Sequence, residues 1–320
     1  MGVWGADIEI NESKKYYPAF ICSIMQTILE LGIKGNYSGV SAIVVPSLCD
    51  SLKTLGQNWK YAVKDIPFIP MTYPQNRKPD YAVDFTVEMY KRVINDLENI
   101  TGEKFDESKL QKTYEIYNEH NRVMREFSKI SEDYEVSAAD RSAVFKSAWF
   151  MLKEEHSEKV KALNKALREL PEERYEGHRV ITTGFILDSK EVLEIMENNK
   201  LRIVGDDIAH ETRQFRTDVP KKETALLSIA SQWSNIEGCS YAYDPLRLRG
   251  KLIAKLANER KAVGVVFALL KFCDTEEYDA PIMLDDIHDA GIKAVTIEID
   301  QESGSIEQIR TRIQTFAEML

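Results

Sequence analysis

The chain has 320 residues, of which 43% are hydrophobic, and its formal net charge is −10 at pH 7. This length and composition predict about two globular domains of roughly 150 residues each. The charge disfavours nucleic acid and anionic membranes as partners, because both are bound through clustered Lys and Arg. No run approaches the roughly 18 apolar residues of a membrane span, and we identify no signal peptide. We therefore expect a cytoplasmic protein with reduced thiols.

The first part of the chain, residues 1–79, predicts an α/β domain. Apolar residues recur with a period near four in one segment, and short apolar runs alternate with helical spacing in the next. The elements predicted from these patterns are a helix over 16–35 opened by Pro18, strands over 42–45 and 68–71, and a helix over 51–63. The order of the last three is β-α-β.

Residues 80–171 contain no predicted strand and form a charged, helical block. Its predicted helices cover 81–99, 106–128 and 138–170. From 172 to 320 strands and helices alternate, with strands at 179–183, 201–204, 264–270 and 293–299, and helices at 190–199, 221–235, 246–260, 282–290 and 305–320. The whole pattern predicts an α/β protein with two doubly wound, Rossmann- or flavodoxin-like parallel-sheet domains and a helical middle block.

Two of the four cysteines, Cys49 and Cys273, follow apolar runs predicted as buried strands, and each is followed by Asp. The carboxyl ends of parallel strands are where open α/β sheets bind ligands. Asp50 and Asp274 are predicted N-caps of the next helices, Asp274 with Glu277 as a capping box, which places each thiol near a positive helix end. A single free cysteine is more often a buried apolar residue, but two in matching places favour a shared ligand.

The other cysteines and the histidines give weaker signals. Cys22 is predicted in the first turns of the helix over 16–35 and is a third candidate ligand. Cys239 follows a predicted helix and lacks the strand-end position. Without any Cys-x-x-Cys, zinc ribbons, thioredoxin-type dithiols and bacterial ferredoxin sites are disfavoured. The five histidines show no metal-ligand spacing and are predicted as core or surface residues; they are His120, His156, His178, His210 and His288.

Charged residues after the strand at 201–204 are a further candidate group: Asp206, Asp207, Glu211 and Arg213. They could line a site at the sheet edge, although such side chains are more often solvated or paired with each other. Arg312 is predicted on a helix surface. The chain has no Gly-x-Gly-x-x-Gly after a strand and no Gly-x-x-x-x-Gly-Lys loop, which disfavours nicotinamide chemistry and nucleotide hydrolysis.

Seven segments, spread over nearly the whole chain, carry a resemblance to a known family. They are YPAFICSIMQ (17–26), LCDSL (48–52), GQNW (56–59), YNEH (117–120), ETRQFR (211–216), KFCDTEEY (271–278) and RTRIQTF (310–316). Together they resemble the 2-hydroxyacyl-CoA dehydratase component D family, which also includes benzoyl-CoA reductase subunits.

This resemblance implies that Cys22, Cys49 and Cys273 hold the iron of a 4Fe-4S cluster at the domain interface. It implies a heterodimer with a homologous alpha subunit, which binds most of the acyl-CoA substrate. An ATP-dependent iron-sulfur activator would deliver one electron to form a ketyl radical, which makes the weakly acidic proton at carbon 3 removable. Water would then leave an (R)-2-hydroxyacyl-CoA to give a 2-enoyl-CoA. We also expect the first domain to be N-terminally incomplete, because family members carry a further stretch before residues 1–5.

Two alternatives stay open from the residues. One is a benzoyl-CoA-reductase-like subunit, which would act on an aromatic thioester. The other is a non-catalytic metal-binding or electron-relay protein, in which Cys22, Cys49, Cys239 and Cys273 would form a zinc site. A cysteine nucleophile would need a histidine base nearby in space, and the sequence assigns no catalytic side chain.

Overall fold

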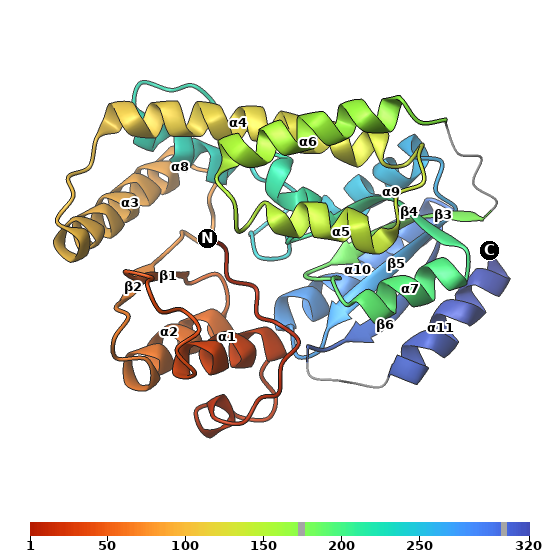
Figure 1. The fold of residues 1–320 in the computed structure, drawn as a ribbon, viewed down its shortest axis with the longest axis horizontal. Helices are drawn as coiled ribbons and strands as arrows, with labels where there is room; N and C mark the ends of the chain where they lie inside the picture. The colour runs from red at the N-terminus through yellow and green to blue at the C-terminus, as the bar shows by residue number, and fades with distance from the viewer. Residues whose placement is uncertain (172–176, 302–305) are drawn as a thin grey trace. The chain divides into compact units, whose positions relative to one another are not determined.

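The computed structural model describes residues 1–171, 177–301 and 306–320, and it consists of two compact units. Unit 1 comprises residues 1–2, 116–218 and 246–320, and unit 2 comprises residues 3–115 and 219–245. The division falls within the helix α4 (Glu107–Ile130), labelled in Figure 1. The domain limits predicted at residues 79 and 171 stay a prediction, and residue 172 and the helix start predicted at residue 305 lie outside the described residues.

Unit 1 contains a four-stranded sheet within the described ranges, with all strands parallel and the spatial order β4-β3-β5-β6. The strands are β3 (His178–Gly184), β4 (Leu201–Ile208), β5 (Gly264–Leu270) and β6 (Lys293–Ile299). All four were predicted, and β5 and β6 have the predicted bounds. A strand covered on both faces needs apolar side chains on both sides, and Val265, Val266, Phe267 and Ala268 of β5 are fully buried.

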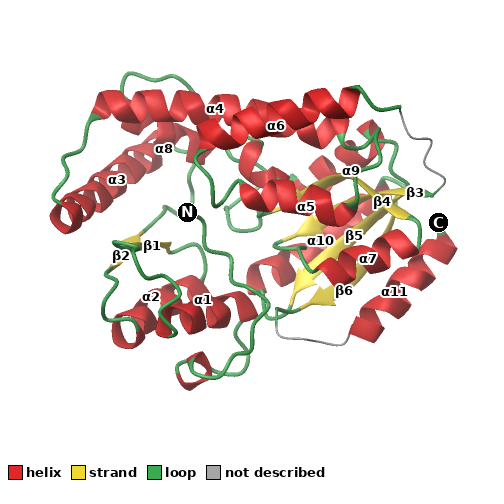
Figure 2. Cartoon of the chain, in the orientation of Figure 1, coloured by secondary structure: helices red, strands yellow, loops and turns green. Residues whose placement is uncertain are grey.

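Helices cover both faces of this sheet. α7 (Lys190–Asn198) contacts α11 (Ile306–Met319), and α9 (Arg249–Glu259) contacts α10 (Asp274–Asp289). Figure 2 shows the two pairs on opposite faces. This confirms a doubly wound α/β arrangement for the C-terminal part of the chain.

The helix α10 starts earlier than predicted, at Asp274 and not at residue 282. The prediction began after Pro281 because proline disfavours a helix interior. In the structure Pro281 lies inside the helix. Glu276 and Asp279, in the turns before it, form ion pairs with Arg249, and these contacts hold the turns that proline would weaken.

The helix predicted over 138–170 is in fact two helices, α5 (Ala138–Ser147) and α6 (Lys153–Arg168). Between them, Trp149 uses its polar groups for contacts outside a helix. Its carbonyl oxygen accepts a hydrogen bond from Gly2 N at 3.0 Å, and its indole N–H donates to the carbonyl of His210 at 2.9 Å. These tertiary contacts interrupt a segment whose apolar spacing alone is continuous.

α5, α6 and the second half of α4 form a helical layer in unit 1. Its core consists of buried apolar side chains, including Met124, Phe127, Phe145 and Val160, together with Phe215 of the 3-10 helix η2 (Thr212–Phe215). The rings of Phe127 and Phe145 lie 5.6 Å apart in an edge arrangement, a favourable aromatic geometry.

Unit 2 contains a single β-α-β element. Its helices and strands are η1 (Ser13–Lys15), α1 (Ser23–Ile33), β1 (Ile43–Pro46), α2 (Asp50–Ala62), β2 (Phe68–Met71), α3 (Asp80–Thr101) and α8 (Ala225–Asn235). β1 and β2 pair in parallel, as predicted. Among the described residues this sheet has two strands, so the doubly wound arrangement predicted for the first domain is not seen.

A buried carboxylate fixes the N-terminal segment of unit 2 to α1. Glu30, fully buried in α1, accepts hydrogen bonds from the backbone N–H groups of Glu12 and Ser13 and pairs with Lys34 at 2.9 Å. Burial alone would raise the pKa of Glu30, but these donors lower it to about 2. Glu30 is therefore ionised and ties η1 to the helix that follows Cys22.

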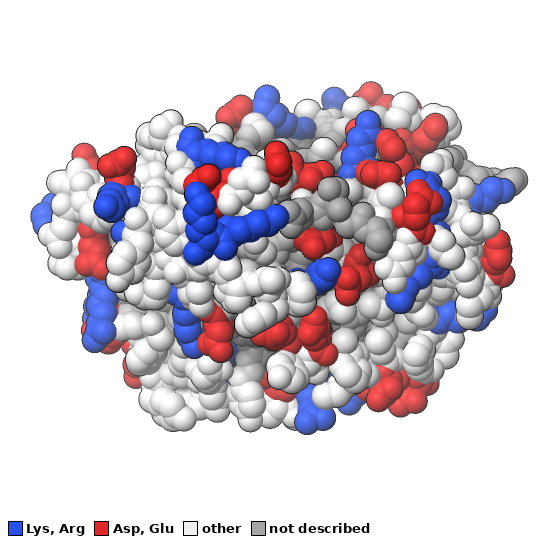
Figure 3. Space-filling model, turned by 90° about the horizontal axis from the view of Figure 1, so that it is seen from below, with Lys and Arg blue, Asp and Glu red and all other residues white. Residues whose placement is uncertain are grey.

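Charge on the surface is mixed. On the face drawn in Figure 3, acidic and basic side chains are interspersed. Across the described ranges, no helix is both long and apolar enough to cross a membrane.

Candidate functional site

Each of the three cysteines singled out by the sequence is the N-cap residue of a helix. Cys22 precedes α1, Cys49 precedes α2 and Cys273 precedes α10. The first turn of a helix has free N–H groups and the positive end of the helix dipole, both of which favour negative charge. The three positions therefore favour thiolates.

The immediate surroundings of the three thiols differ. Cys22 and Cys273 are buried, with 7% and 6% of their surface exposed, and Cys49 is half-buried. The Cys49 sulfur accepts a hydrogen bond from the backbone N–H of Leu52 at 3.4 Å. The Cys273 sulfur lies 3.5 Å from Thr275 Oγ1. Both contacts lie in the first turn of the helix that each cysteine caps.

The predicted caps Asp50 and Asp274 are wrong by one residue. Both aspartates are the first residue of their helix, and cysteine occupies the cap position before each. Cys22, predicted inside a helix, also lies outside it, because residues 17–21 form bends and a turn. Oxygen side chains are the preferred N-caps, so sequence preference selects Asp over Cys.

The strand-end position of Cys273 is confirmed, and it lies at the switch point of the four-stranded sheet. From β3 the chain moves to β4 on one side and then to β5 on the other. Ligands of open α/β sheets bind outside the carboxyl ends of the strands at such a point. Cys273 follows β5 by three residues, and Cys49 follows β1 by the same distance in unit 2.

The backbone at this switch point is unusual in two places. Phe272, directly before Cys273, has a φ of 61°, which costs a bulky residue about 1–2 kcal/mol. Gly184 ends β3 at a φ of 143°, and a Cβ there would lie 2.2 Å from the carbonyl oxygen of Ala268 in β5. Strained backbone of this kind is typical of functional sites.

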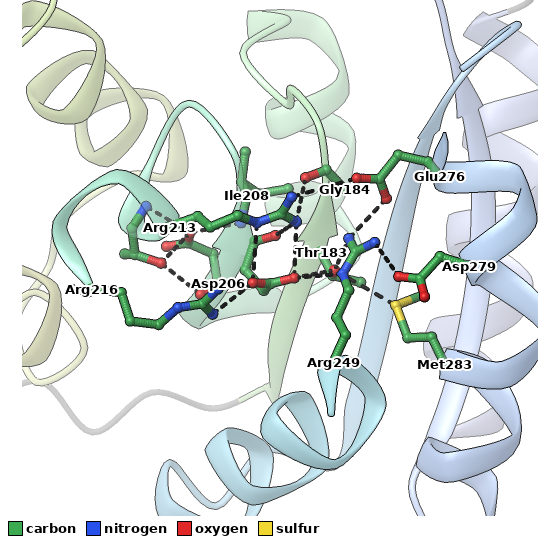
Figure 4. Close-up of polar contacts among 12 residues, drawn as sticks. Thr183, Gly184, Asp206, Ile208, Arg213, Arg216, Arg249, Glu276, Asp279 and Met283 are labelled. Carbon is green, nitrogen blue, oxygen red and sulfur yellow. Dashed lines mark hydrogen bonds and ion pairs between the residues drawn. The ribbon is translucent and has the colours of Figure 1, made fainter. Parts of the chain in front are cut away.

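A buried ion network lies at the same end of the sheet (Figure 4). At its centre Asp207, the seventh residue of β4, accepts hydrogen bonds from Arg213 at 2.9 Å, Arg216 at 2.8 Å and Arg249 at 2.9 Å. Thr183 donates a further hydrogen bond at 3.1 Å. Burial raises the pKa of Asp207, but the three guanidinium groups hold it well below its usual range.

Arg249 connects this network to the helix that Cys273 caps. Its guanidinium pairs with Glu276 at 2.8 Å and with Asp279 at 2.8 Å, and Arg213 lies 3.6 Å from Glu276 (Figure 4). Three arginines thus face three carboxylates, those of Asp207, Glu276 and Asp279. The network anchors the first two turns of α10 to the carboxyl end of the sheet and leaves no net charge there.

Asp206 and Glu211 form a second buried cluster, around Arg141 of α5. Arg141 pairs with Asp206 and, at 2.6 Å, with Glu211. Asp206 also accepts a hydrogen bond from the Thr212 hydroxyl at 2.7 Å. Burial raises the pKa of Glu211 to about 7, against the lowering effect of Arg141. The sequence left open whether these residues line a site at the sheet edge or pair with each other, and the structure favours mutual pairing.

Two of the five histidines form a buried pair. His120 Nε2 lies 2.9 Å from His156 Nδ1, and His156 Nε2 lies 2.8 Å from the Ser147 hydroxyl. Both are core residues, as predicted, but sequence spacing gave no signal for the contact. Arg312 is exposed, also as predicted, and donates to the carbonyl of Thr296 at 2.8 Å.

The structure does not assemble the cysteines into a ready-made metal site. In the described part of the chain, no three His, Cys, Asp or Glu side chains form a group that could hold a metal ion. Cys22 and Cys49 belong to unit 2 and Cys273 to unit 1. Cys239, in unit 2, is the N-cap of neither α8 nor α9. The ligand set therefore stays a prediction.

Comparison with known proteins identifies the family. The model of the family described as 2-hydroxyglutaryl-CoA dehydratase, D-component, matches residues 1–320. The chain belongs to this family. Membership in the D-component family confirms the resemblance that the segments around Cys22, Cys49 and Cys273 suggested.

Three relatives in the D-component family match all of this chain and 86% of their own length. The (R)-phenyllactyl-CoA dehydratase beta subunit of Clostridium sporogenes is 47% identical over 322 residues. The lactoyl-CoA dehydratase subunit beta of Anaerotignum propionicum is 41% identical over 324 residues. The (R)-2-hydroxyglutaryl-CoA dehydratase subunit beta of Acidaminococcus fermentans is 34% identical over 328 residues.

Proposed function

We propose that this chain is the beta subunit of a 2-hydroxyacyl-CoA dehydratase, a hydro-lyase that converts an (R)-2-hydroxyacyl-CoA and yields water and a 2-enoyl-CoA. The observation that carries the proposal is the match over the whole chain to three beta subunits of such enzymes, at 47%, 41% and 34% identity. A beta subunit works with a partner subunit, and we propose a heterodimer with a homologous alpha subunit that binds most of the acyl-CoA.

We further propose that Cys22, Cys49 and Cys273 hold a 4Fe-4S cluster. Thiolates are the usual ligands of such clusters. Support comes from the helix positions: each of these cysteines caps a helix whose N-terminus favours an anionic ligand. Cys239, which lacks this position, is not assigned to the cluster.

When bound, the cluster would supply a one-electron carrier, which an ATP-dependent iron-sulfur activator would charge. Dehydration is not a net oxidation or reduction, so one electron can serve repeated turnovers. The chain's own residues would control the surroundings of the thiols. Burial of Cys22 and Cys273 excludes water, and the balanced ion network beside α10 adds no net charge near Cys273.

For the substrate we propose an acyl group with an apolar side chain. The relatives named for phenyllactyl and lactoyl thioesters are more similar to this chain than the one named for the acidic 2-hydroxyglutaryl thioester. The sequence motifs also resemble those of the beta subunit of 2-hydroxyisocaproyl-CoA dehydratase, whose acyl group is apolar as well.

Metal analysis of cysteine variants tests the ligand set. After anaerobic purification or reconstitution we expect about four irons per chain, retained in Cys239→Ser and lost in Cys273→Ser. Cys239→Ser is the matched control, because it removes a thiol that caps no helix. One zinc per chain and no iron, with loss of metal in Cys239→Ser, would instead favour the four-cysteine zinc site.

Activity assays test the reaction. The chain, its alpha partner and the activator are combined with ATP, a low-potential reductant and a panel of thioesters. We expect 2-enoyl-CoA from (R)-2-hydroxyacyl-CoA substrates with apolar side chains, and slower reaction with (R)-2-hydroxyglutaryl-CoA. Reduction of benzoyl-CoA with no dehydration would favour the benzoyl-CoA-reductase-like alternative.

A further inference from the structure

Ser147, the last residue of α5, lines a cavity in the helical layer of unit 1. The cavity has a volume of about 480 Å³, and its lining comes from α4, α5, α6 and the segment before α5 (Figure 1). The wall is mainly apolar and includes Phe127, Val144, Leu163 and Leu167. Ligand sites of this size combine apolar walls with a few polar groups that hold the ligand in one orientation. The Ser147 hydroxyl is a polar group of this kind.

The Ser147 hydroxyl begins a chain of hydrogen bonds that leads into the core. His156 Nε2 lies 2.8 Å from Ser147 Oγ, and His156 Nδ1 lies 2.9 Å from His120 Nε2. The carbonyl oxygen of Val144 is a second acceptor for the Ser147 hydroxyl, at 2.8 Å, and a hydrogen bond to the same carbonyl favours protonated His156. A nucleophile, a base and a group that orients the base follow one another in this order in serine hydrolases.

Both imidazoles are neutral at pH 7. Burial is the main cause that lowers the pKa of His156, and burial lowers the pKa of His120 from 6.5 to about 3. A neutral His156 can accept the proton of a serine hydroxyl. Lys153 contributes to both shifts through its charge, and its ammonium donates to the carbonyl of Ala148, the residue after Ser147. A cation in this place favours the negative charge that develops on a carbonyl oxygen under attack.

We propose that Ser147 and His156, with His120 as a positioning residue, form a second active site that hydrolyses neutral esters with a small apolar acyl group. Ser147 Oγ forms a bond to the acyl carbon, and its proton passes to His156 Nε2. The bond between the acyl carbon and the ester oxygen breaks, and the alcohol leaves with that proton. Water, which gives a proton to His156, then attacks the acyl-serine. The carboxylic acid leaves, and Ser147 regains its proton.

The cavity lining favours a neutral ester over an acyl-CoA. Two carboxylate side chains, Glu135 and Asp140, also line the cavity, and like charges repel an anionic substrate. The phosphates of coenzyme A are anionic, so an acyl-CoA with the same acyl group should react more slowly than the neutral ester. The inference is therefore independent of the proposed dehydratase function and of the cluster.

Ser137 is a matched control in the same helical layer. It is the N-cap of α5, whereas Ser147 is the last residue of that helix. Its hydroxyl donates to Asp140 Oδ2 at 2.7 Å, so it bonds to a carboxylate and not to an imidazole. A reagent that selects activated serines should distinguish Ser147 from Ser137.

The experiment treats the full chain with a fluorophosphonate probe and maps the label by mass spectrometry. We expect the label on Ser147 and not on Ser137. With p-nitrophenyl butyrate the chain should release more than one p-nitrophenol per molecule, and with butyryl-CoA it should react more slowly. Ser147→Ala should abolish both labelling and ester turnover. His156→Gln should slow both by about a hundredfold or more, the usual effect of a general base.

Three results would overturn the inference. Absence of label at Ser147 in the wild-type chain would show that its hydroxyl is not activated. Ester hydrolysis by Ser147→Ala at the wild-type rate would place the reaction at another nucleophile, such as the Lys153 amine. Labelling of Ser147 at the wild-type rate in His156→Gln would show that His156 is not the base. The first two results involve no change at a buried residue, so they decide the inference even where His156→Gln does not fold.

Discussion

Replacement of Arg249 tests whether the buried ion network holds the helix behind Cys273. In Arg249→Met the side chain keeps much of its length and loses its charge and donors. It gives up hydrogen bonds or ion pairs to Asp207, Thr183, Glu276 and Asp279, all between 2.8 and 3.0 Å. The Arg249 side chain is only 4% exposed, so water cannot replace these contacts without opening the structure.

The cost depends on what each partner has left. Asp207 keeps Arg213 and Arg216, and the Asp279 side chain is 27% exposed and can be hydrated. Glu276 is fully buried, and of its described ion pairs it keeps the longer one, to Arg213 at 3.6 Å. Removal of one partner from a buried ion pair costs about 3–5 kcal/mol. Because Asp207 stays paired and Asp279 can be hydrated, we expect a stability loss at the lower end of this range, about 3 kcal/mol. This is a large share of the free energy of unfolding of a typical protein, which is about 5–15 kcal/mol.

Amide hydrogen exchange measures this loss of stability in α10 itself. A local measurement is preferable because a chain with two units need not unfold in a single transition. Arg249→Met should speed the slowest-exchanging amides of α10, by about tenfold for each 1.4 kcal/mol lost. Arg312→Met is the control, because it removes an exposed arginine with one described hydrogen bond; exposed charges contribute about 0–1 kcal/mol. Adding Glu276→Gln to Arg249→Met should recover part of the protection.

Two outcomes would refute this reasoning. If Arg249→Met exchanges no faster in α10 than Arg312→Met, the network does not anchor the helix. If Glu276→Gln adds its own loss to that of Arg249→Met and recovers nothing, the buried charge of Glu276 is not the source of the cost. In that case the contact with Thr183 or the lost packing would be the larger factor.

Three further predictions follow from buried groups. Burial lowers the pKa of His120 from 6.5 to about 3, so the folded state binds fewer protons than the unfolded state. The contribution of neutral His120 to the free energy of unfolding is therefore complete above pH 6.5 and is lost as the pH drops toward 3. In urea titrations at several pH values, His120→Gln should make this decline less steep, and a decline as steep as in the wild type would contradict the assignment. Arg77, 1% exposed, donates to the carbonyl of Ile236 at 3.1 Å; Arg77→Met should speed limited proteolysis of the segment between α8 and α9, and wild-type cleavage rates would count against this anchor. A Cβ on Gly56 would lie 2.4 Å from the ring of Phe68, so Gly56→Ala should destabilise the protein by an overpacking cost of about 1–3 kcal/mol and lower its melting temperature. Adding Phe68→Leu should restore part of the melting temperature; if it restores none, the strain does not come from the contact with Phe68.

The sheet of unit 1 and the strand-end cysteines were predictable because their signals are local. Apolar runs of strand length gave all four strands of that sheet, and a cysteine that follows such a run must lie near the carboxyl end of its strand. The cap itself was not predictable in the same way. The known preference for oxygen side chains at the N-cap favours Asp50 and Asp274 over the cysteines that precede them. Nothing in the local sequence indicates that each helix begins one residue earlier and is capped by the cysteine.

The supporting network was not predictable because its members are distant in sequence. Arg249 is 42 residues from Asp207, and His120 is 36 residues from His156. No periodicity connects such positions, and only the fold brings them together. Glu276 belongs to a segment that carried the family resemblance, but its role depends on Arg249, to which no motif points.

The network also explains how α10 can begin with so many acids and still favour an anionic sulfur at its cap. Asp274, Glu276 and Glu277 occupy its first turn, where carboxylates stabilise the helix through its dipole but would repel a thiolate at Cys273. Asp274 and Glu277 are exposed, and water screens their charge. Glu276 is buried, where screening is weak, and it is the one that pairs with an arginine at 2.8 Å. The positive end of the helix therefore remains available to Cys273, and loss of Arg249 should weaken both the helix and the binding of the proposed anionic cluster.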